Sequence, residues 1–272
     1  MNSGKLDFKI SFEIKELDIN IDNLDIDFKV KRSSRNEPDL AYIYLWNLDE
    51  TTYQSILQKN AQINLYLTIG NNDPIRFFVG EIDINTICRK PLLNKYKNTP
   101  DICTYFKIID SKRAYLNSLI NINYRERVSS TKIILDCLDS MGLKANHLEN
   151  SIPEKFYDSY KAKGYPHVIL RKICEALDIN LIIQNGILKG ANGAYITSSP
   201  HIEELNVYNS SLPIFQNLQE IIFYANPIPA LNPLDIIYCN FSTLNGLYMI
   251  SSIDFYGNNY DKICTSKLTI GL

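Results

Sequence analysis

The sequence lacks the features that would place it in a membrane or in a secretion pathway. It has no run of about 20 apolar residues, and acidic side chains occur in the first 18 residues, where a signal peptide would have an apolar core. We therefore expect a protein without a membrane anchor that stays in the cytoplasm unless it is assembled into something larger. The net charge is −2 and no basic block occurs, so nothing indicates sequence-specific binding of nucleic acid.

Motifs for metals and catalysis are also missing. The six cysteines form no C-x-x-C pair, which argues against structural zinc and favours reduced, buried thiols. Asp18-Ile-Asn-Ile-Asp22 begins like a calcium loop, but Asn23 and Lys29 stand where an EF-hand needs Gly and Glu. His201-Ile-Glu203 lacks the P-C-x-x-C of zinc deaminases. With no phosphate-binding, dinucleotide-binding or nucleophile motif either, we expect no catalytic residues, metal site or cofactor, and a binding or structural role.

What the sequence does have is strand patterning at both ends. In residues 8–14, Phe8, Ile10, Phe12 and Ile14 alternate with polar residues, as in an antiparallel strand with one wet face. We expect residues 1–110 to form one antiparallel β-domain, closed or nearly closed, with polar loops at 31–38 and 90–100. Further strands are predicted at 17–21, 24–30, 63–69, 101–109, 219–225, 234–239, 247–255 and 263–270, and one starting at 75.

Residues 37–82 are the most informative stretch. They predict a strand at 40–46, a two-turn helix that begins after Asn47, a strand at 63–69, a turn at 70–74 and another strand. The first of these strands is apolar on both faces: Ala41, Ile43 and Leu45 form one, and Leu40, Tyr42, Tyr44 and Trp46 the other. Such a strand is expected to be buried on both faces, one in its own domain and the other against a neighbouring element or subunit. Tyr and Trp are common at interfaces. We therefore predict that the second set lies at a subunit or domain contact.

In the middle of the chain the spacing of apolar residues changes from that of strands to that of helices. Two segments carry apolar residues at helical spacing, namely Ile134, Cys137, Leu138 and Met141, closed by Gly142, and Leu170, Ile173, Cys174 and Leu177. Asn185-Gly186 lies between two short apolar runs and predicts a two-residue hairpin turn. Residues 111–190 are therefore expected to form a small α/β module made of a helix, a loop rich in Tyr and Lys, a second helix and a hairpin.

The order of elements resembles the baseplate hub proteins of bacteriophage tails, similar in fold to the hubs of T4-type and Mu-type phages. The segment 164–190 resembles the family's second helix and hairpin, and GLYMISSIDFYG at 246–257 resembles its closing motif, although Phe255-Tyr-Gly257 lacks the usual His. In the opening stretch, the matching residues are Pro38, Ala41, Ile43, Tyr44, Asn47-Leu48, Thr51, Ile63, Leu65, Gly70, Phe77-Phe78 and Gly80.

The resemblance implies an α+β, mostly β fold, with two antiparallel tail-tube-like β-barrels (1–110 and 191–272) flanking the α/β module (111–190). It implies a non-enzymatic virion protein, assembled in the bacterial cytoplasm, whose homotrimer adapts a sixfold tail tube to a threefold spike. Its partners would be the tube protein, the spike protein and other baseplate proteins, and DNA would pass through a central channel. The alternatives are a hexameric single-barrel tail adaptor, a tail-tip carbohydrate-binding protein and, less favoured in a chain of this length, a cell-wall hydrolase.

Overall fold

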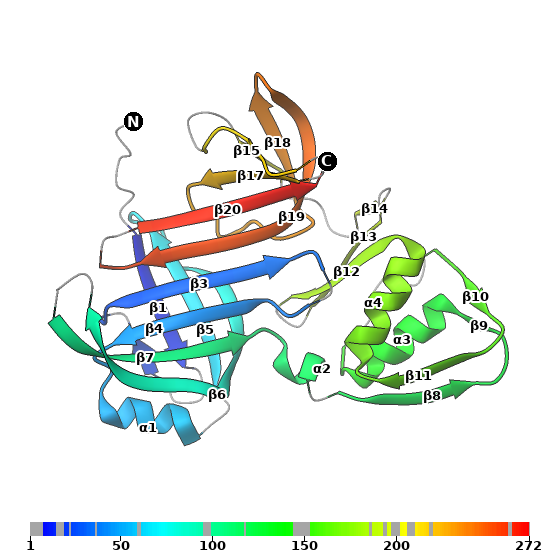
Figure 1. The fold of residues 1–272 in the computed structure, drawn as a ribbon, viewed down its shortest axis with the longest axis horizontal. Coiled ribbons are helices and arrows are strands. Elements are labelled where there is room, and N and C mark those ends of the chain that lie inside the picture. The colour runs from blue at the N-terminus through cyan, green and yellow to red at the C-terminus, as the bar shows by residue number, and fades with distance from the viewer. Residues whose placement is uncertain are drawn as a thin grey trace.

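A computed structural model of the chain describes residues 8–14, 19–21, 23–35, 37–58, 61–94, 99–116, 118–143, 153–184, 187–192, 195–196, 202–205, 210–217, 220–260 and 263–271. Strands dominate it, and nearly all of them pair antiparallel (Figure 1). The mostly β, antiparallel character predicted from the alternating pattern is therefore confirmed. Within the described ranges, no helix is both long and apolar enough to span a membrane.

The N-terminal region forms seven strands and one helix. The helix begins where predicted, because the Asp49 carboxylate accepts a hydrogen bond from the Thr52 N–H at 2.8 Å, and Ile56 is fully buried on its inner face. The elements are β1 (Phe8–Ile14), β2 (Ile19–Ile21), β3 (Ile26–Ser33), β4 (Leu40–Trp46), α1 (Glu50–Gln58), β5 (Gln62–Ile69), β6 (Ile75–Asn94) and β7 (Thr99–Ile109).

Two loops predicted in this region are partly strand. Residues 90–94 continue β6, and 99–100 begin β7, because the ladder between these strands runs out to the pair Asn94↔Thr99. The expected polar loop at 31–38 is also shorter, since β3 extends through Ser33. In both places main-chain pairing extends a strand over residues that do not alternate between apolar and polar side chains.

The C-terminal strands join the same sheet as the N-terminal ones. They are β15 (Ile202–Leu205), β16 (Ile214–Phe215), β17 (Glu220–Ala225), β18 (Ile236–Phe241), β19 (Leu244–Asn258) and β20 (Ile263–Gly271). The link is β19, which pairs with β3 from Ser252↔Ser33 to Asn258↔Asp27. The main path runs β16-β17-β20-β19-β3-β4-β7-β6-β5-β1-β2. Among the strands that the structure describes, this path is open at both ends, and the closure of two barrels stays a prediction.

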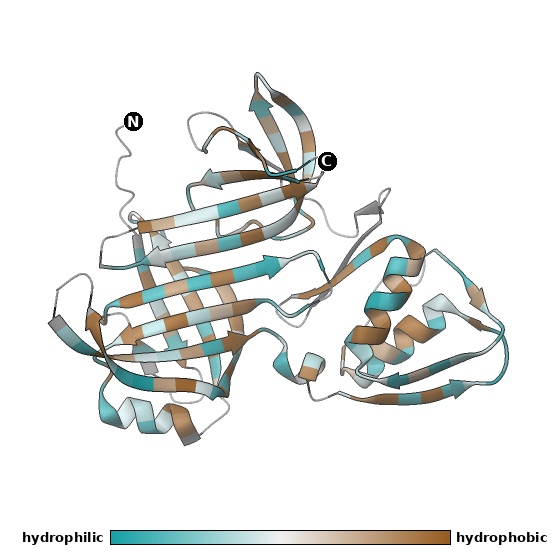
Figure 2. Ribbon diagram, in the orientation of Figure 1, coloured by the Kyte–Doolittle hydropathy of each residue, from teal (hydrophilic) through white to brown (hydrophobic). Residues whose placement is uncertain are grey.

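A single hydrophobic core serves both β regions. Phe77 on β6 lies 5.7 Å from Phe28 and 5.9 Å from Phe255, measured between ring centroids, so it contacts both regions. A β-bulge makes this possible: the register with β5 passes from Leu65↔Phe78 to Tyr66↔Arg76, which leaves Phe77 as an extra residue. Phe77 and Phe78 are consequently both buried. Figure 2 shows the alternation of apolar and polar residues along the other strands of this sheet.

The middle region (residues 111–190) has a separate core between two helices. Both predicted helices are confirmed, as is the hairpin, whose strands pair at Gln184↔Ile187 around residues 185–186, which lie outside the described set. The segment expected to be a loop between the helices instead contains two short strands, at 156–157 and 160–164. The second was not predicted because residues 160–164 contain too few apolar side chains to show a strand pattern. The elements are α2 (Lys112–Leu116), β8 (Ile120–Tyr124), β9 (Val128–Ser129), α3 (Ser130–Ser140), β10 (Phe156–Tyr157), β11 (Tyr160–Gly164), α4 (Pro166–Leu177), β12 (Ile179–Gln184) and β13 (Ile187–Asn192), which extends slightly past residue 190. The short strand β14 (Tyr195–Ile196) follows and pairs with β13.

Candidate interaction surface

Strand β4 has one face in the core and one on the surface of the sheet. Ala41, Ile43 and Leu45 are 0% exposed, as expected for the inner face. On the β4 outer face (Leu40, Tyr42, Tyr44 and Trp46), Tyr44 is 38% exposed and Trp46 only 6%, while Leu40 and Tyr42 are half-buried. The structure therefore places the four residues together on one surface, and their role at a contact stays a prediction.

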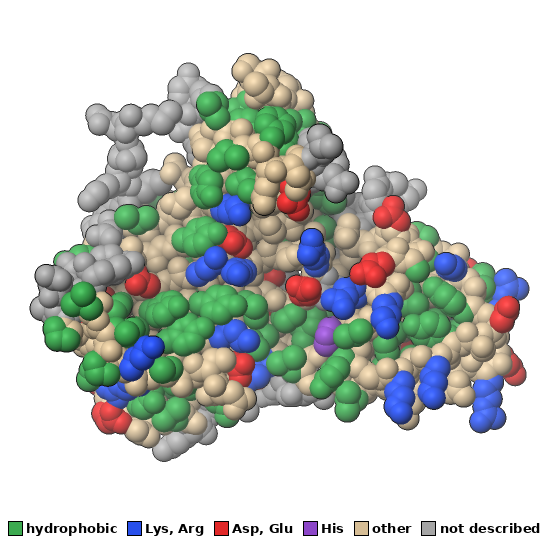
Figure 3. Space-filling model, in the orientation of Figure 1, with side chains coloured by type: hydrophobic (Ala, Val, Ile, Leu, Met, Phe, Trp, Pro, Cys, Tyr) green, Lys and Arg blue, Asp and Glu red, His purple; other side chains and the backbone are tan. Residues whose placement is uncertain are grey.

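Side chains from neighbouring strands extend this surface. The rings of Tyr44 and Tyr105 lie 4.8 Å apart, and Lys31 lies 5.8 Å above the ring of Tyr42. Burial, then the nearby hydroxyls of Tyr44 and Tyr42, raise the pKa of Tyr105. Figure 3 shows hydrophobic side chains gathered where β3, β4 and β7 lie. Tyr105 was missed from the sequence because only the register Tyr44↔Tyr105 brings it beside β4.

A pocket of about 490 Å³ opens at one end of this surface. Tyr44 and Trp46 line it together with Leu92 of β6 and Tyr256 of β19. Lys29 lies 4.7 Å above the Tyr256 ring and forms an ion pair with Asp254 at 3.8 Å. A smaller hollow of about 260 Å³ adjoins it, between Tyr44, Cys88 and Tyr105. The surface is thus aromatic, hollowed and close to neutral, which suits a protein contact better than binding of a strongly charged ligand.

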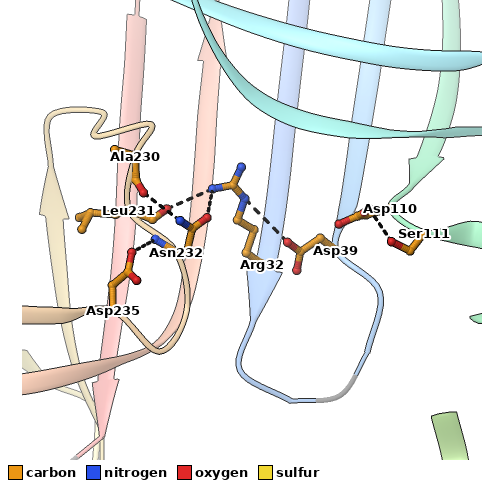
Figure 4. A network of polar contacts seen from close by, with 8 residues as sticks. All are labelled: Arg32, Asp39, Asp110, Ser111, Ala230, Leu231, Asn232 and Asp235. Carbon is orange, nitrogen blue, oxygen red and sulfur yellow. Dashed lines mark hydrogen bonds and ion pairs between the residues drawn. The ribbon is translucent and has the colours of Figure 1, made fainter. Parts of the chain in front are cut away.

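A buried polar network lies on the other side of the same region (Figure 4). Nη1 of Arg32 donates to the Leu231 carbonyl at 3.0 Å and to Oδ1 of Asn232 at 3.1 Å. Its Nε lies 3.8 Å from Oδ2 of Asp39. The Asp110 N–H donates to the Asp39 carbonyl at 3.0 Å. The network therefore ties β3 to the loop before β18 and to the start of the middle region.

Burial controls the electrostatics of this network. The Arg32 side chain is 2% exposed, and its burial lowers its pKa, an effect opposed by Asp39, Asp110 and Asp235. Arg32 belongs to the stretch expected from the sequence to be a polar loop, so its burial corrects that expectation. The chain offers no local signal for it, because its partners Leu231 and Asn232 lie about 200 residues away.

The same junction contains a strained leucine. Leu234 has φ +72°, a left-handed conformation that is unfavourable for a bulky side chain. Its N–H donates to the Ile250 carbonyl at 2.9 Å, and its side chain packs against Ile182 of β12. The loop before β18 is thus held by Arg32 on one side and by the middle region on the other.

The thiols and histidines show no catalytic arrangement in the described residues. All six cysteines are free, and burial raises the pKa of Cys103 and Cys239 to about 11 and that of Cys137, Cys174 and Cys264 to about 12. No group of three His, Cys, Asp or Glu side chains in those ranges could hold a metal ion. Burial also lowers the pKa of His167. His147, His201 and the carboxylates of Asp18 and Asp22 lie outside the described set.

Comparison with known proteins is informative at the level of structure. No protein-family model and no curated protein matches the sequence. A 43 kDa tail protein of prophage MuSo2 from Shewanella oneidensis matches with a TM-score of 0.64 at 10% identity, over 96% of each chain. A tail protein from Neisseria meningitidis matches with a TM-score of 0.62 at 8% identity, over 97% of this chain and 96% of that one.

This chain has a tail-protein fold. A component of the Escherichia coli type VI secretion system, described as similar in structure to T4 bacteriophage tail proteins, also matches, with a TM-score of 0.59 at 8% identity over 91% of this chain and 73% of that one. The likeness covers both β regions and the middle region together. At such low identity the likeness establishes the fold alone, because one fold can serve different functions.

Proposed function

We propose that the chain is a structural, non-enzymatic component of a phage or phage-like tail, and specifically a baseplate hub. In this role three copies, each of 31.3 kDa, form a ring of about 94 kDa. The ring adapts a sixfold tail tube to a threefold spike, with the tube, spike and other baseplate proteins as partners. Residues 1–110 and 191–272 supply the two tube-like barrels, and residues 111–190 the module between them.

The observation that carries this proposal is the match to tail proteins along almost the whole of both chains. A chain with two β regions can occupy two of six positions around a ring, so that a trimer presents six similar units. The pairing of β19 with β3 supports this arrangement, because it sets the two regions rigidly relative to each other. The virion tail baseplate, reached after assembly in the bacterial cytoplasm, is the corresponding location.

A three-dimensional map of the assembled tail tests the proposal. We expect a threefold ring of this chain between tube and spike. Six copies in a ring would point to the single-barrel adaptor instead, and a peripheral position would overturn both.

The β4 outer face offers a mutational test of the same role. Tyr44→Asp places a charge on the proposed contact and should abolish incorporation into the tail. Asn71→Asp, which adds the same charge at an exposed turn, should leave incorporation unchanged. Equal incorporation of the two variants would remove this surface from the proposal while leaving the hub role to be decided by the map.

One observation favours a second candidate, a tail-tip carbohydrate-binding protein. The pocket of about 490 Å³ combines Tyr44 and Tyr256 with Asp27 and Asn258, and sugars offer an apolar ring face with polar edges to such a lining. Calorimetric titration of the purified chain with N-acetylglucosamine trimer is the test. Heat of binding that is lost in Tyr256→Ala supports this candidate, and absence of heat at millimolar sugar argues against it.

A further inference from the structure

The charges of this chain are distributed unevenly, although its total is close to zero. Residues 111–190 contain twelve Lys and Arg against eight Asp and Glu, a net charge of +4 in a chain whose total is −2. Figure 3 shows Lys and Arg side chains gathered along the edge of the middle region where Figure 1 draws β8 and β11. Lys161 and Lys163 lie on one strand, and the pairing of β8 with β11 brings them beside the arginines of an earlier part of the chain, so the sequence shows no basic block.

Strands β8 and β11 form a two-stranded ribbon with two unlike faces. Ile120 and Ala162 are 5% and 0% exposed and belong to the core of the middle region. The outward residues are Asn121, Asn123, Lys161 and Lys163, which we call the basic ribbon. All four are exposed, and they face each other directly in the pairs Lys161↔Asn123 and Lys163↔Asn121. The ribbon therefore presents cations and amides, with no carboxylate among its four outward residues.

Two arginines continue the basic ribbon at one end. Arg125 and Arg127 follow β8 and are exposed, and the guanidinium of Arg127 lies 4.4 Å above the ring of Phe156, which is 49% exposed. The carboxylate of Glu126 lies between them in the sequence, and the exposed Glu154 and Asp158 lie on either side of Phe156. No described carboxylate forms an ion pair with either lysine of the ribbon, whereas Lys132 on α3 is paired with Asp136 at 2.7 Å. The ribbon's charge is thus available to a ligand.

We propose that the basic ribbon, with Arg125 and Arg127, binds the phosphate backbone of nucleic acid without reading its sequence. Lys161 and Lys163 lie two residues apart on one strand, about 6.7 Å along it, a separation that successive phosphates of one nucleic-acid strand can meet. Lys, Arg and Asn are side chains that contact phosphates, and contacts to phosphate carry no direct sequence information. The proposal goes beyond the tail role and does not depend on it.

Fluorescence anisotropy with a fluorescein-labelled 20-base-pair duplex tests this binding at 50 and 200 mM NaCl. Four cationic contacts predict a slope of log K against log salt of about −3.6, which is about 150-fold weaker binding at the higher salt. Lys161→Gln/Lys163→Gln should reduce the slope to about −1.8 and the salt effect to about 12-fold. Because both side chains are exposed, the variant should keep the circular dichroism spectrum of the parent.

Lys90→Gln/Lys172→Gln is the matched control, since it removes the same charge from exposed lysines elsewhere and should leave the slope unchanged. Absence of binding at 50 mM NaCl, or an equal change in slope for both double variants, would overturn the proposal. Binding to phosphatidylglycerol vesicles or to heparin in preference to the duplex would also overturn it and would assign the ribbon to a lipid surface or to polyanions in general.

Discussion

Replacing Arg32 by Met is the most direct test of the junction between the β regions and the middle region. The substitution keeps an unbranched side chain but removes the only cation of the network drawn in Figure 4. Asp39 and Asp110 are 5% and 2% exposed, so their buried carboxylates would lose the favourable interaction with the Arg32 cation. The carbonyl of Leu231 would also lose its donor.

The expected cost follows from this burial. Removing one partner of a buried ion pair costs about 3–5 kcal/mol, because the remaining charge is left uncompensated. With a urea dependence of about 3 kcal/mol per M, a loss of about 4 kcal/mol would move the unfolding midpoint down by about 1.3 M. In Arg32→Met/Asp39→Asn one of the carboxylates is neutralised, so part of that loss should be recovered, a coupling of about 1–3 kcal/mol.

The single tryptophan of the chain makes the assay simple. Trp46 is 6% exposed and lies on β4, the strand next to β3 in the sheet, so its fluorescence in a urea titration reports on this part of the structure. Arg35→Met is the matched control, because Arg35 is exposed three residues further along the chain, and it should cost less than about 0.5 kcal/mol. If the midpoints of the two variants agree within about 0.3 M, the network does not stabilise the junction and the reasoning is wrong.

Three further predictions concern the core, the pH response and the thiols. Phe77→Ala should lower the free energy of unfolding by about 3–5 kcal/mol, because Phe77 is a buried contact of both β regions. Ile75→Ala on the same strand, at a site 42% exposed, is the control and should lower it by less than about 0.5 kcal/mol in the same urea titration. Burial lowers the pKa of His167, so the unfolded chain binds this proton at a higher pH than the folded chain. The free energy of unfolding should therefore fall as the pH drops below about 6.5. For the His167→Gln variant it should fall less over the same pH interval. Ellman's reagent at pH 8 should modify Cys88, the exposed thiol, well before the buried cysteines, and Cys88→Ser should remove that fast phase.

Local pattern was sufficient for most of the individual elements. Phe8 to Ile14 alternates with period two and forms β1, and the apolar spacing from Ile134 to Met141 predicts α3. Gly142, the residue expected to close this helix, follows its end at φ +70°. The N-terminal cap is local too, since the Ser129 hydroxyl accepts from the Lys132 N–H at 3.2 Å. These features depend on residues within a few positions of one another, which is why the sequence alone reveals them.

Features that depend on distant residues were not accessible in this way. The bulge that inserts Phe77 between Phe28 and Phe255 depends on the register of three strands. The burial of Arg32 depends on a loop about 200 residues away. The same limit applies to the β4 outer face: its four residues could be read from one strand, but the aromatic neighbours and the pocket come from β6, β7 and β19.

The sequence divides the chain into three regions, whereas the structure has two main hydrophobic cores, one of them shared by both β regions. Most buried apolar residues before Asp110 and from Leu205 onward share one hydrophobic cluster, and most of those between Ala114 and Ile183 form another, while Leu234 and Ile182 pack against each other between them. A shared core and the β19–β3 pairing prevent the two β regions from moving independently, whereas the middle region is attached through the Arg32 network and Leu234. If the chain forms a ring, the angle between its two β regions is set within each copy. Any adjustment between the ring and a partner must then come from the middle region, which also carries the basic ribbon.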